Sequence, residues 1–417
     1  MITKNKLLII GAVWPEPKSS AAGSRMMQLI ALFRAQQYNI LFATATSKTD
    51  NAHNLAAEGI NTVPIKLNDA SFDEFIKKEQ PDIVLFDRFI TEEQYGWRVS
   101  EQCPNALLIL DTEDLHGLRK ARELAFKVSG NYRDFLANSV AKREIASIYR
   151  CDLSLIISEA EMNLLHTYFK VPSNLLFYVP FMLDEVTIKK QKAIPSFHER
   201  MHFVTVGNFF HKPNYQAVWH LKKHIWPGIK QQLSQAELHI YGAYADQKVK
   251  QLHNEQTGFL VKGFVSDINQ AMQKARVCLA PLQFGAGLKG KLIDAMINGT
   301  PAIMSSIAAE GMFGSLKPNG YIADQPDLFI AKAVALYNNV QDWHVMQKNG
   351  YEVINTRFNA HLFNTHLLET IASLQINLAL HREANFTGSL LQHQSMQAAK
   401  FMSKWIELKN ATSTHTS

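Results

Sequence analysis

The segment Pro281-Leu-Gln-Phe-Gly-Ala-Gly-Leu-Lys-Gly-Lys-Leu-Ile-Asp-Ala-Met-Ile-Asn-Gly-Thr-Pro301 follows a short apolar run, Val277–Ala280, and passes into a helical pattern near Lys291. The loop glycines let the backbone approach a ligand closely and present N–H groups to it. The helix N-terminus favours phosphate, and two lysines add full positive charge at the same place. The spacing differs from that of a Walker loop. This order predicts an α/β unit that binds an anion; a glycine turn with solvated lysines is the alternative.

Short apolar runs alternate with helical patterns along most of the chain. Continuous apolar runs are typical of strands buried on both faces of a parallel sheet, and their alternation with helices indicates βαβ units. The sequence therefore predicts an α/β protein with two Rossmann-like domains facing a cleft. The expected strands are Leu7–Val13, Asn39–Thr44, Thr62–Ile65, Ile83–Phe86, Ala106–Leu110 and Leu153–Ile157 in the first half, and His202–Val206, Glu237–Tyr241, Phe259–Val261, Val277–Ala280 and Ala302–Met304 in the second.

A charged, lysine-rich stretch separates the two alternations and sets the expected domain boundaries. Residues 1–180 form the first domain, 181–201 the linker and 202–355 the second domain. The pattern that follows is helical, and we expect residues 356–417 to form C-terminal helices that pack back towards the first domain. The last residues, Ala411–Ser417, are small and polar, so we expect them to fray.

The composition of the 417 residues is that of a globular protein, with 47% hydrophobic and 19% charged residues. The net charge of +6 suits an anionic ligand or lipid surface but is also common without one. Basic and aromatic residues do not interleave as nucleic-acid binding would favour. Three well-separated cysteines argue against a disulfide framework or a zinc site, and the apolar runs are shorter than the roughly 20 residues of a membrane span. We therefore expect a cytoplasmic protein that does not bind nucleic acid.

Six segments of the second half, in their order and spacing, resemble the donor domain of the retaining GT-B glycosyltransferases of family 4, also called group 1. Together they extend over about 110 residues, so the likeness is far more specific than one glycine loop. The segments are Phe203–Asn214, Leu238–Gly242, Val261–Asp267, Ala275–Pro281, Phe284–Pro301 and Ser306–Met312.

The resemblance implies a UDP- or GDP-linked sugar bound on the second domain, with no other cofactor. Asp294 matches the second acid of the family's Glu-x7-Glu motif, which holds the nucleotide ribose. Lys291 and the backbone of residues 287–289 match the contacts to the diphosphate and the sugar. The full set of implied donor contacts is Gly207, Asn208, Lys212, Gly263, Phe264, Val265, Gly287, Leu288, Lys289, Lys291 and Asp294, of which residues 263–265 line the base.

Three positions depart from the family pattern. Ala286 occupies the place of the motif's first Glu, which usually contacts the donor sugar. Asn208 stands where an Arg is common, and Lys212 is only approximately placed for the usual phosphate lysine. The resemblance therefore implies more about phosphate binding than about the identity of the sugar.

The first half resembles the family more loosely. Gly23, Arg25 and Asp114 match positions on the acceptor side of the cleft, and His116 resembles the family's histidine beside the reacting sugar. His116 and Lys289 are then the expected catalytic residues, which orient the donor or stabilise its leaving phosphate. From local sequence alone, a helix-capping or core role for His116 and a solvated, acid-rich helix start around Asp114 are alternatives.

The expected reaction is transfer of a sugar, with retention, to a hydroxyl of a glycan, a lipid-linked molecule or a small molecule. No DxD pair stands in the context of a metal-bridged diphosphate, so we expect no metal, since cationic side chains replace it. A catalytically weak nucleotide-sugar-binding subunit, which Ala286 supports, and a nucleotide-sugar epimerase are the alternatives. An excess of basic residues between Arg119 and Arg150 leaves peripheral contact with the inner face of a membrane open; a solvated helix face is the commoner explanation of such an excess.

Overall fold

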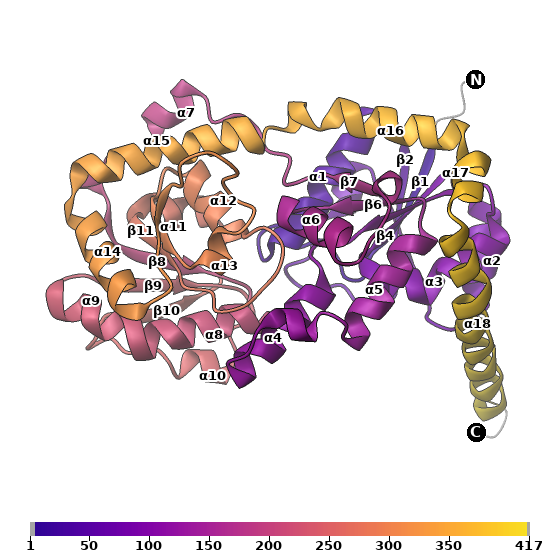
Figure 1. Ribbon diagram of the computed structural model, residues 1–417, viewed down its shortest axis with the longest axis horizontal. Helices are drawn as coiled ribbons and strands as arrows, with labels where there is room; N and C mark the ends of the chain where they lie inside the picture. The colour runs from indigo at the N-terminus through magenta and orange to yellow at the C-terminus, as the bar shows by residue number, and fades with distance from the viewer. Residues whose placement is uncertain (1–4, 415–417) are drawn as a thin grey trace.

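The computed structural model describes residues 5–414, which form two α/β domains with long C-terminal helices along one side (Figure 1). All strand pairs within the two sheets are parallel. The first sheet has the order β3-β2-β1-β4-β5-β6-β7 and the second the order β10-β9-β8-β11-β12-β13. In each sheet the order reverses beside the domain's first strand, which creates the crevice where open parallel sheets bind ligands. The prediction of two Rossmann-like domains is confirmed.

The first domain closely follows the expected alternation of strands and helices. The expected strand Leu7–Val13 is too long, because the chain leaves the sheet after Ile10 and turns into a loop. The strand Leu176–Tyr178 was not expected, since three residues carry too little periodicity to detect. The strands are β1 Lys6–Ile10, β2 Asn39–Thr44, β3 Asn61–Pro64, β4 Ile83–Asp87, β5 Leu107–Asp111, β6 Leu153–Ile156 and β7 Leu176–Tyr178; the helices are α1 Ala21–Ala35, α2 Ser71–Glu79, α3 Arg88–Gln102, α4 His116–Val128, α5 Ser139–Arg150 and α6 Glu159–Thr167.

The pleat of the central strand β1 divides the core of the first domain into two layers. Leu8 and Ile10 pack with the cluster on one face of the sheet, while Leu7 and Ile9 pack with the cluster on the other. All four side chains are at most 1% exposed. Successive side chains of a strand point to opposite faces, so a continuous apolar run is what a sheet covered on both faces requires.

The second domain repeats this architecture around β8 and β11. Trp226 and Trp343 are almost fully buried in its core. The strands are β8 Met201–Val206, β9 Leu238–Tyr241, β10 Phe259–Gly263, β11 Ala275–Ala280, β12 Ala302–Met304 and β13 Gly320–Ile322; the helices are α8 Lys212–His220, α9 Trp226–Gln232, α10 Gln247–Lys250, α11 Ile268–Lys274, α12 Gly290–Ile297, α13 Ser306–Ala309, α14 Pro326–Asn338 and α15 Val340–Arg357.

The chain crosses between the domains twice, at neighbouring points. The backbone N–H of Leu183 donates to the carbonyl of Phe358 at 2.7 Å, and the N–H of Ala360 donates to the carbonyl of Leu183 at 2.9 Å. The first crossing leads through the short helix α7 (Ile188–Ala193) into the second domain. The second crossing returns the chain to the first domain.

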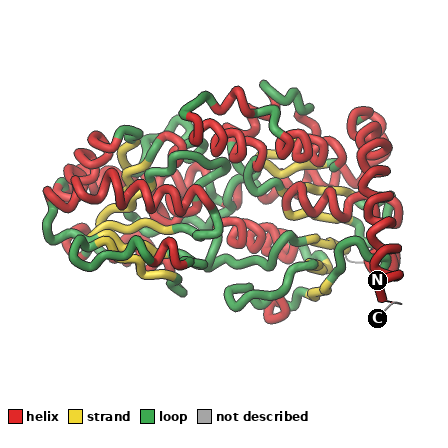
Figure 2. Tube along the Cα trace, turned by 90° about the horizontal axis from the view of Figure 1, so that it is seen from below, coloured by secondary structure: helices red, strands yellow, loops and turns green. Residues whose placement is uncertain are grey.

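The returning helices α16 (Asn364–Ile376), α17 (Leu378–Ala384) and α18 (Phe386–Thr414) lie on the first domain, at its outer edge in Figures 1 and 2. α16 buries Leu367 and Ile371 in one of the domain's two core layers. Of the end that we expect to fray, residues 411–414 belong to α18, and residues 415–417 lie outside the described part. Within residues 5–414, no helix is both long and apolar enough to cross a membrane.

Candidate active site

A cleft of about 920 Å³ lies between the domains and is lined by residues of both. Loops after β1, β4 and β5 form its first-domain wall, and loops after β8, β9, β10 and β11 form the opposite wall. These are the carboxyl ends of the central strands of both sheets. Open parallel sheets bind ligands at this end, so the cleft is the candidate active site.

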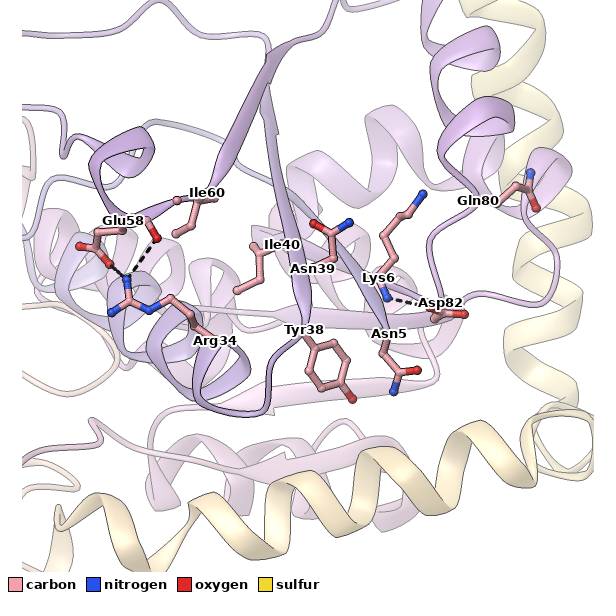
Figure 3. A pocket seen from close by; sticks show the side chains of 11 residues that line it. Asn5, Lys6, Arg34, Tyr38, Asn39, Ile40, Glu58, Ile60, Gln80 and Asp82 are labelled. Atoms are coloured by element: carbon pink, nitrogen blue, oxygen red, sulfur yellow. Dashed lines mark hydrogen bonds and ion pairs between the residues drawn. The ribbon is translucent and has the colours of Figure 1, made fainter. Parts of the chain in front are cut away.

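A second hollow, of about 600 Å³, lies at the opposite end of the first sheet (Figure 3). It is lined by Lys6 and Asn39 at the starts of β1 and β2, and by Asp82 just before β4. Arg34 and Glu58 form an ion pair of 2.7 Å on its wall. Ligands rarely bind at the amino ends of parallel strands, so we assign no function to this hollow.

The glycine-rich loop reaches the cleft as the sequence predicts, between the end of β11 and the start of α12 at Gly290. Gly287 has a φ of 65°, where a side chain is strained, and a Cβ there would lie 2.8 Å from the Cβ of Asp114. A Cβ on Gly290 would lie 2.6 Å from the Cβ of Ala21, the first residue of α1. The N-termini of α12 and α1 are therefore adjacent, and both carry partial positive charge.

Lys289 is buried in this loop, at 8% exposure. Its Nζ donates to the carbonyl oxygens of Ala286 at 3.0 Å and Gly287 at 2.5 Å. Burial lowers the pKa of Lys289 to about 8, although the nearby Glu310 opposes this shift. Since charge-assisted hydrogen bonds are stronger than bonds to neutral carbonyls, a phosphate in the cleft would be a better partner for this ammonium group.

Lys291 and Asp294 lie one turn apart on α12, and both line the cleft. The Nζ of Lys291 donates to Oδ1 of Asn214 at 3.0 Å, and burial lowers its pKa to about 8. Burial raises the pKa of Asp294 to about 7. The helix thus presents a cation and a hydrogen-bond acceptor at the spacing a phosphate and a neighbouring sugar hydroxyl would need.

Most of the other expected donor residues also line the cleft: Gly207, Asn208, Phe264, Val265, Gly287 and Leu288. A Cβ on residue 207 would lie 2.5 Å from the Cγ of Asn214, whose side chain accepts the hydrogen bond from Lys291. Only a glycine at position 207 leaves room for this side chain.

Two expected donor residues lie elsewhere. The side chain of Lys212 is 72% exposed and pairs with Glu123 of α4 at 3.2 Å, outside the cleft lining, because the first residue of α8 directs its side chain outward. Gly263 ends β10 behind the lining, where its carbonyl accepts a hydrogen bond from the N–H of Gly242 at 2.9 Å.

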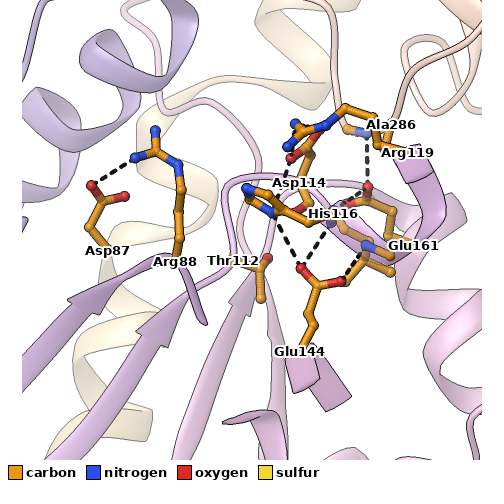
Figure 4. A network of polar contacts seen from close by, with 12 residues as sticks. Asp87, Arg88, Thr112, Asp114, His116, Arg119, Glu144, Glu161 and Ala286 are labelled. Carbon is orange, nitrogen blue, oxygen red and sulfur yellow. Dashed lines mark hydrogen bonds and ion pairs between the residues drawn. The ribbon is translucent and has the colours of Figure 1, made fainter. Parts of the chain in front are cut away.

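The first-domain wall is built around the N-terminus of α4 (Figure 4). Glu144 of α5 accepts hydrogen bonds from the backbone N–H groups of His116 and Gly117, both at 2.9 Å. Arg119 holds both carboxylate oxygens of Asp114, at 2.7 and 2.6 Å. Burial tends to raise the pKa of Asp114, but Arg119 and His116 outweigh it and bring the value down to about 2. Asp114 is therefore ionised, and Glu144 serves as the cap that the sequence alone did not reveal.

The hydrogen bonding of His116 defines what its ring can do in the cleft. Nδ1 lies 3.0 Å from the carbonyl oxygen of Asp114. A carbonyl can only accept, so Nδ1 carries a proton, and Nε2 is the ring nitrogen that remains to interact in the cleft. His116 lines the cleft, as expected, and its Nε2 can form a hydrogen bond with a hydroxyl there.

Gly23 and Arg25 are both expected near the acceptor, but only one of them reaches the cleft. Gly23 lines the cleft, and a Cβ there would lie 2.4 Å from the backbone of Glu16. Arg25 does not reach the cleft: it is completely buried and pairs with Asp111 at 2.8 Å. Its NH1 group also donates to the carbonyl of Val179 at 2.7 Å. The expectation that Arg25 lies on the acceptor side is not met, because its side chain leaves α1 on the side that faces the sheet, where it pairs with Asp111 and the carbonyl of Val179.

Two residues of the first domain hold the glycine loop of the second, and the sequence did not identify them. Arg122 donates to the carbonyl of Gly285 at 2.8 Å and forms a two-pronged pair with Glu310, at 2.8 and 2.6 Å. Glu161 accepts a hydrogen bond from the N–H of Gly287 at 2.8 Å. Burial raises the pKa of Glu161 to about 8. These contacts fix the loop against the first domain.

Arg88 after β4 and Glu113 after β5 have backbone conformations that residues other than glycine rarely adopt. Arg88 has a φ of 70° and Glu113 a φ of 62°, and both line the cleft. Strained conformations of this kind concentrate at functional sites. Burial and the neighbouring Asp111 raise the pKa of Glu113 to about 8. Glu113 is thus mainly protonated at neutral pH and can donate a hydrogen bond into the cleft.

Among the described residues, one group of three side chains could hold a metal ion: His202, Glu237 and His239. His202 lies at the start of β8, and the other two lie around the start of β9. This is the amino end of the second sheet, so the group lies away from the cleft and outside its lining.

The fold and the cleft define a class of protein: a GT-B protein with two Rossmann-like domains and a glycine-rich loop on the second that faces the cleft. The family model described as glycosyl transferases group 1 matches residues 200–339. The second domain thus belongs to the glycosyl transferases group 1. A search of curated proteins gives no match.

Solved structures share the fold over nearly the whole chain. Sucrose-phosphate synthase from Thermosynechococcus elongatus has a TM-score of 0.68 at 14% identity, covering 89% of this chain and 99% of its own. Anabaena HepE in complex with UDP-glucose has a TM-score of 0.65 at 13% identity, with 88% and 100% covered. A mutant of S. aureus TarM, in complex with UDP, Fondaparinux and alpha-GlcNAc-glycerol, has a TM-score of 0.65 at 11% identity, with 89% and 99% covered. At these identities the comparisons show the GT-B fold.

Proposed function

We propose that the chain transfers a hexose from a UDP-linked sugar to a hydroxyl acceptor, with retention of the anomeric configuration, in glycan or glycoconjugate biosynthesis. The observation that carries this proposal is the convergence of Lys289, Lys291 and Asp294 with His116 on one cleft. The UDP-glucose in HepE and the UDP in TarM support uridine over guanosine as the nucleotide.

In this proposal the donor lies on the second domain. Lys289, Lys291 and the adjacent N-termini of α12 and α1 bind the diphosphate and stabilise the charge that develops on it as the sugar departs. Asp294 accepts hydrogen bonds from the ribose hydroxyls, and Phe264 and Val265 lie beside the base. The positive groups are already in place, so no metal ion is needed to neutralise the leaving group.

The affinity for UDP-glucose is expected to be greatest between about pH 7 and 8. It falls as Asp294 takes up a proton below about 7, and as Lys291 loses its proton above about 8. The sugar-linked diphosphate does not itself titrate in this range. Calorimetric titrations across pH should show Asp294→Asn losing the acid limb alone, with Lys212→Ala keeping the wild-type profile. An acid limb that persists in Asp294→Asn would count against the ribose contact.

The state of the carboxylates in the cleft bears on the route by which the configuration would be retained. A double displacement needs an ionised, unpaired carboxylate beside the anomeric carbon. Asp114 is held by Arg119, Glu113 has a pKa of about 8, and Ala286 stands where the family has an acid. We therefore favour attack from the side of the leaving group, whose phosphate takes the acceptor proton while His116 Nε2 orients a sugar hydroxyl.

The acceptor would bind on the first-domain wall, which includes Trp14, Glu113 and Asp114. A glycan, a lipid-linked molecule or a small molecule with a free hydroxyl would suit this mixture of an aromatic ring and hydrogen-bonding groups. We place the reaction in the cytoplasm, because the three cysteines are free and buried rather than paired.

The proposal is tested by screening UDP- and GDP-linked sugars for slow hydrolysis in the absence of an acceptor, with and without a chelator. We expect release of UDP from one UDP-sugar, unchanged by the chelator. His116→Ala should depress this turnover while sparing the affinity for UDP. If neither UDP nor GDP binds in calorimetry, the transferase proposal fails; if UDP binds without turnover of any sugar, the chain is a binding subunit.

A further inference from the structure

Three side chains of the kind that bind metals lie together on one face of the second sheet, outside the lining of the cleft. The parallel strands β8 and β9 pair Phe203 with Leu238. His202 therefore stands beside Glu237 on the neighbouring strand, and the N–H of Phe203 donates to the carbonyl of Glu237 at 2.8 Å. His239 is two residues further along, so it points to the same side as Glu237. The pairing of the two strands thus brings the three side chains together.

The alternation of side chains along β9 leaves this face open to solvent. Leu238 and Ile240 are completely buried in the core on the other face of the sheet. The side chains of the three polar residues are 23% exposed for His202, 38% for Glu237 and 24% for His239. An ion can therefore reach the group from solvent, and a water molecule can complete its coordination.

The distances between the three side chains suit a small ion. Oε2 of Glu237 lies 2.7 Å from Nε2 of His239 and 3.8 Å from Nε2 of His202. The ligand atoms all lie within 4.8 Å of one another. Ligand atoms about 2.0–2.1 Å from a tetrahedral Zn²⁺ are separated by roughly 3.3 Å. The two measured distances lie on either side of this value, so small rotations of the side chains would close the site.

His202 has an uncommon backbone for a residue in a strand. Its φ is 66°, in the left-handed region, and its N–H donates to the hydroxyl of Tyr337 at 3.0 Å. Strained backbones of this kind concentrate at functional sites. Here the strain falls on the one member of the group that β8 supplies.

The hydrogen bonds of the two rings show where their protons lie without an ion. The N–H of Glu237 donates to Nδ1 of His202 at 3.3 Å, so the proton of this neutral ring is on Nε2. Nε2 of His239 donates to the Glu237 carboxylate, which can only accept. An ion bound at both Nε2 atoms moves each ring proton to Nδ1. His202 then gives up only its bond of 3.3 Å, which is longer than most N–H hydrogen bonds.

The charges around the group determine which class of ion fits. Burial lowers the pKa of His202, and Lys230 and Arg276 add to this shift, while Glu237 opposes it. One carboxylate beside two cations does not suit Mg²⁺ or Ca²⁺, which prefer several oxygen ligands. Neutral imidazole nitrogens are instead ligands of Zn²⁺ and of similar transition-metal ions.

We propose that His202, Glu237 and His239 bind a Zn²⁺ ion, with water as the fourth ligand. The ion links β8 to β9 at the amino end of the second sheet and takes no part in chemistry in the cleft. Binding of the ion stabilises the folded chain, because the unfolded chain lacks the assembled site. The three cysteines are buried and do not contribute ligands.

The test measures Zn²⁺ binding to the full chain after treatment with a chelator, by competition with a zinc-sensitive dye. We expect one tightly bound ion per chain and a higher Tm in the presence of Zn²⁺. Co²⁺ in place of Zn²⁺ should show the intense visible absorption of a tetrahedral ion. His239→Ala should weaken Zn²⁺ binding at least tenfold and abolish both the Co²⁺ absorption and the rise in Tm. Glu237→Gln, at the most exposed of the three positions, should also weaken binding.

His53→Ala is the matched control. His53 pairs with Glu58 at 2.5 Å and is 32% exposed, but within residues 5–414 this pair belongs to no group of three metal-binding side chains. The control should keep the wild-type Zn²⁺ affinity, and circular dichroism should be unchanged in all the variants. The proposal is overturned if Zn²⁺ does not bind at micromolar concentration, or if His239→Ala binds it as tightly as the wild type. Equal weakening in His53→Ala and His239→Ala would also overturn it.

Discussion

Arg25→Ala is expected to lower the free energy of unfolding by about 3–5 kcal/mol, the largest stability effect we predict for a single change. Arg25 is completely buried and pairs with Asp111 at 2.8 Å. Its removal leaves the Asp111 carboxylate without its cation, close to Glu113 and Asp87, whose pKa values Asp111 already raises. An unpaired buried charge cannot be compensated by water, so the folded state loses most of this energy.

Urea denaturation followed by circular dichroism measures the effect. Arg34→Ala on the same helix is the matched control, since its pair with Glu58 is about half exposed on the arginine side. Exposed ion pairs contribute about 0–1 kcal/mol to the free energy of unfolding. Equal destabilisation by the two changes would contradict a structural role for Arg25, as would a loss of acceptor affinity in Arg25→Ala without a loss of stability.

Lys289→Met is expected to reduce turnover by about 10²–10³-fold while weakening UDP binding much less. The Nζ of Lys289 now rests on the carbonyls of Ala286 and Gly287. When the sugar departs, the diphosphate gains a further negative charge, so a buried ammonium group interacts with it more strongly than it does in the ground state. The loss should therefore appear in kcat rather than in KM.

Steady-state kinetics on the UDP-sugar found by the hydrolysis screen measures the effect. Lys212→Ala is the control, because its ammonium group pairs with Glu123 outside the cleft lining. It should leave kcat and KM near wild type. A large loss in Lys212→Ala with none in Lys289→Met would contradict this assignment and place Lys212 at the phosphate instead.

The position of the glycine loop at the cleft could be predicted well because its parts lie close together in the chain. Residues 284–294 contain the glycine loop, both lysines and Asp294, and their relation depends only on where β11 ends and α12 begins. Strand and helix periodicity locates those boundaries within a residue or two. The glycine at 287 also has a local signature, since its left-handed backbone favours glycine.

The first-domain wall could not be predicted to the same extent, because its groups come from separate elements. Glu144 on α5 caps α4, and Glu161 on α6 holds Gly287 across the domain interface, 126 positions along the chain. From sequence alone, an acidic residue of an amphipathic helix that makes such a contact looks the same as one that points into solvent. The strained backbones of Arg88 and Glu113 likewise follow from how β4 and β5 meet their neighbours.

The periodicity of the sequence specifies two parallel α/β halves, and its glycine loop predicts an anion site on the second half. Both depend on interactions between near neighbours in the chain. The tertiary structure alone decides which charges reach that site. It buries Arg25 against Asp111, turns Lys212 outward to Glu123 and sets Asp114 against Gly287. Each of these outcomes depends on a partner far away in the chain, and only the packed fold brings such partners within reach.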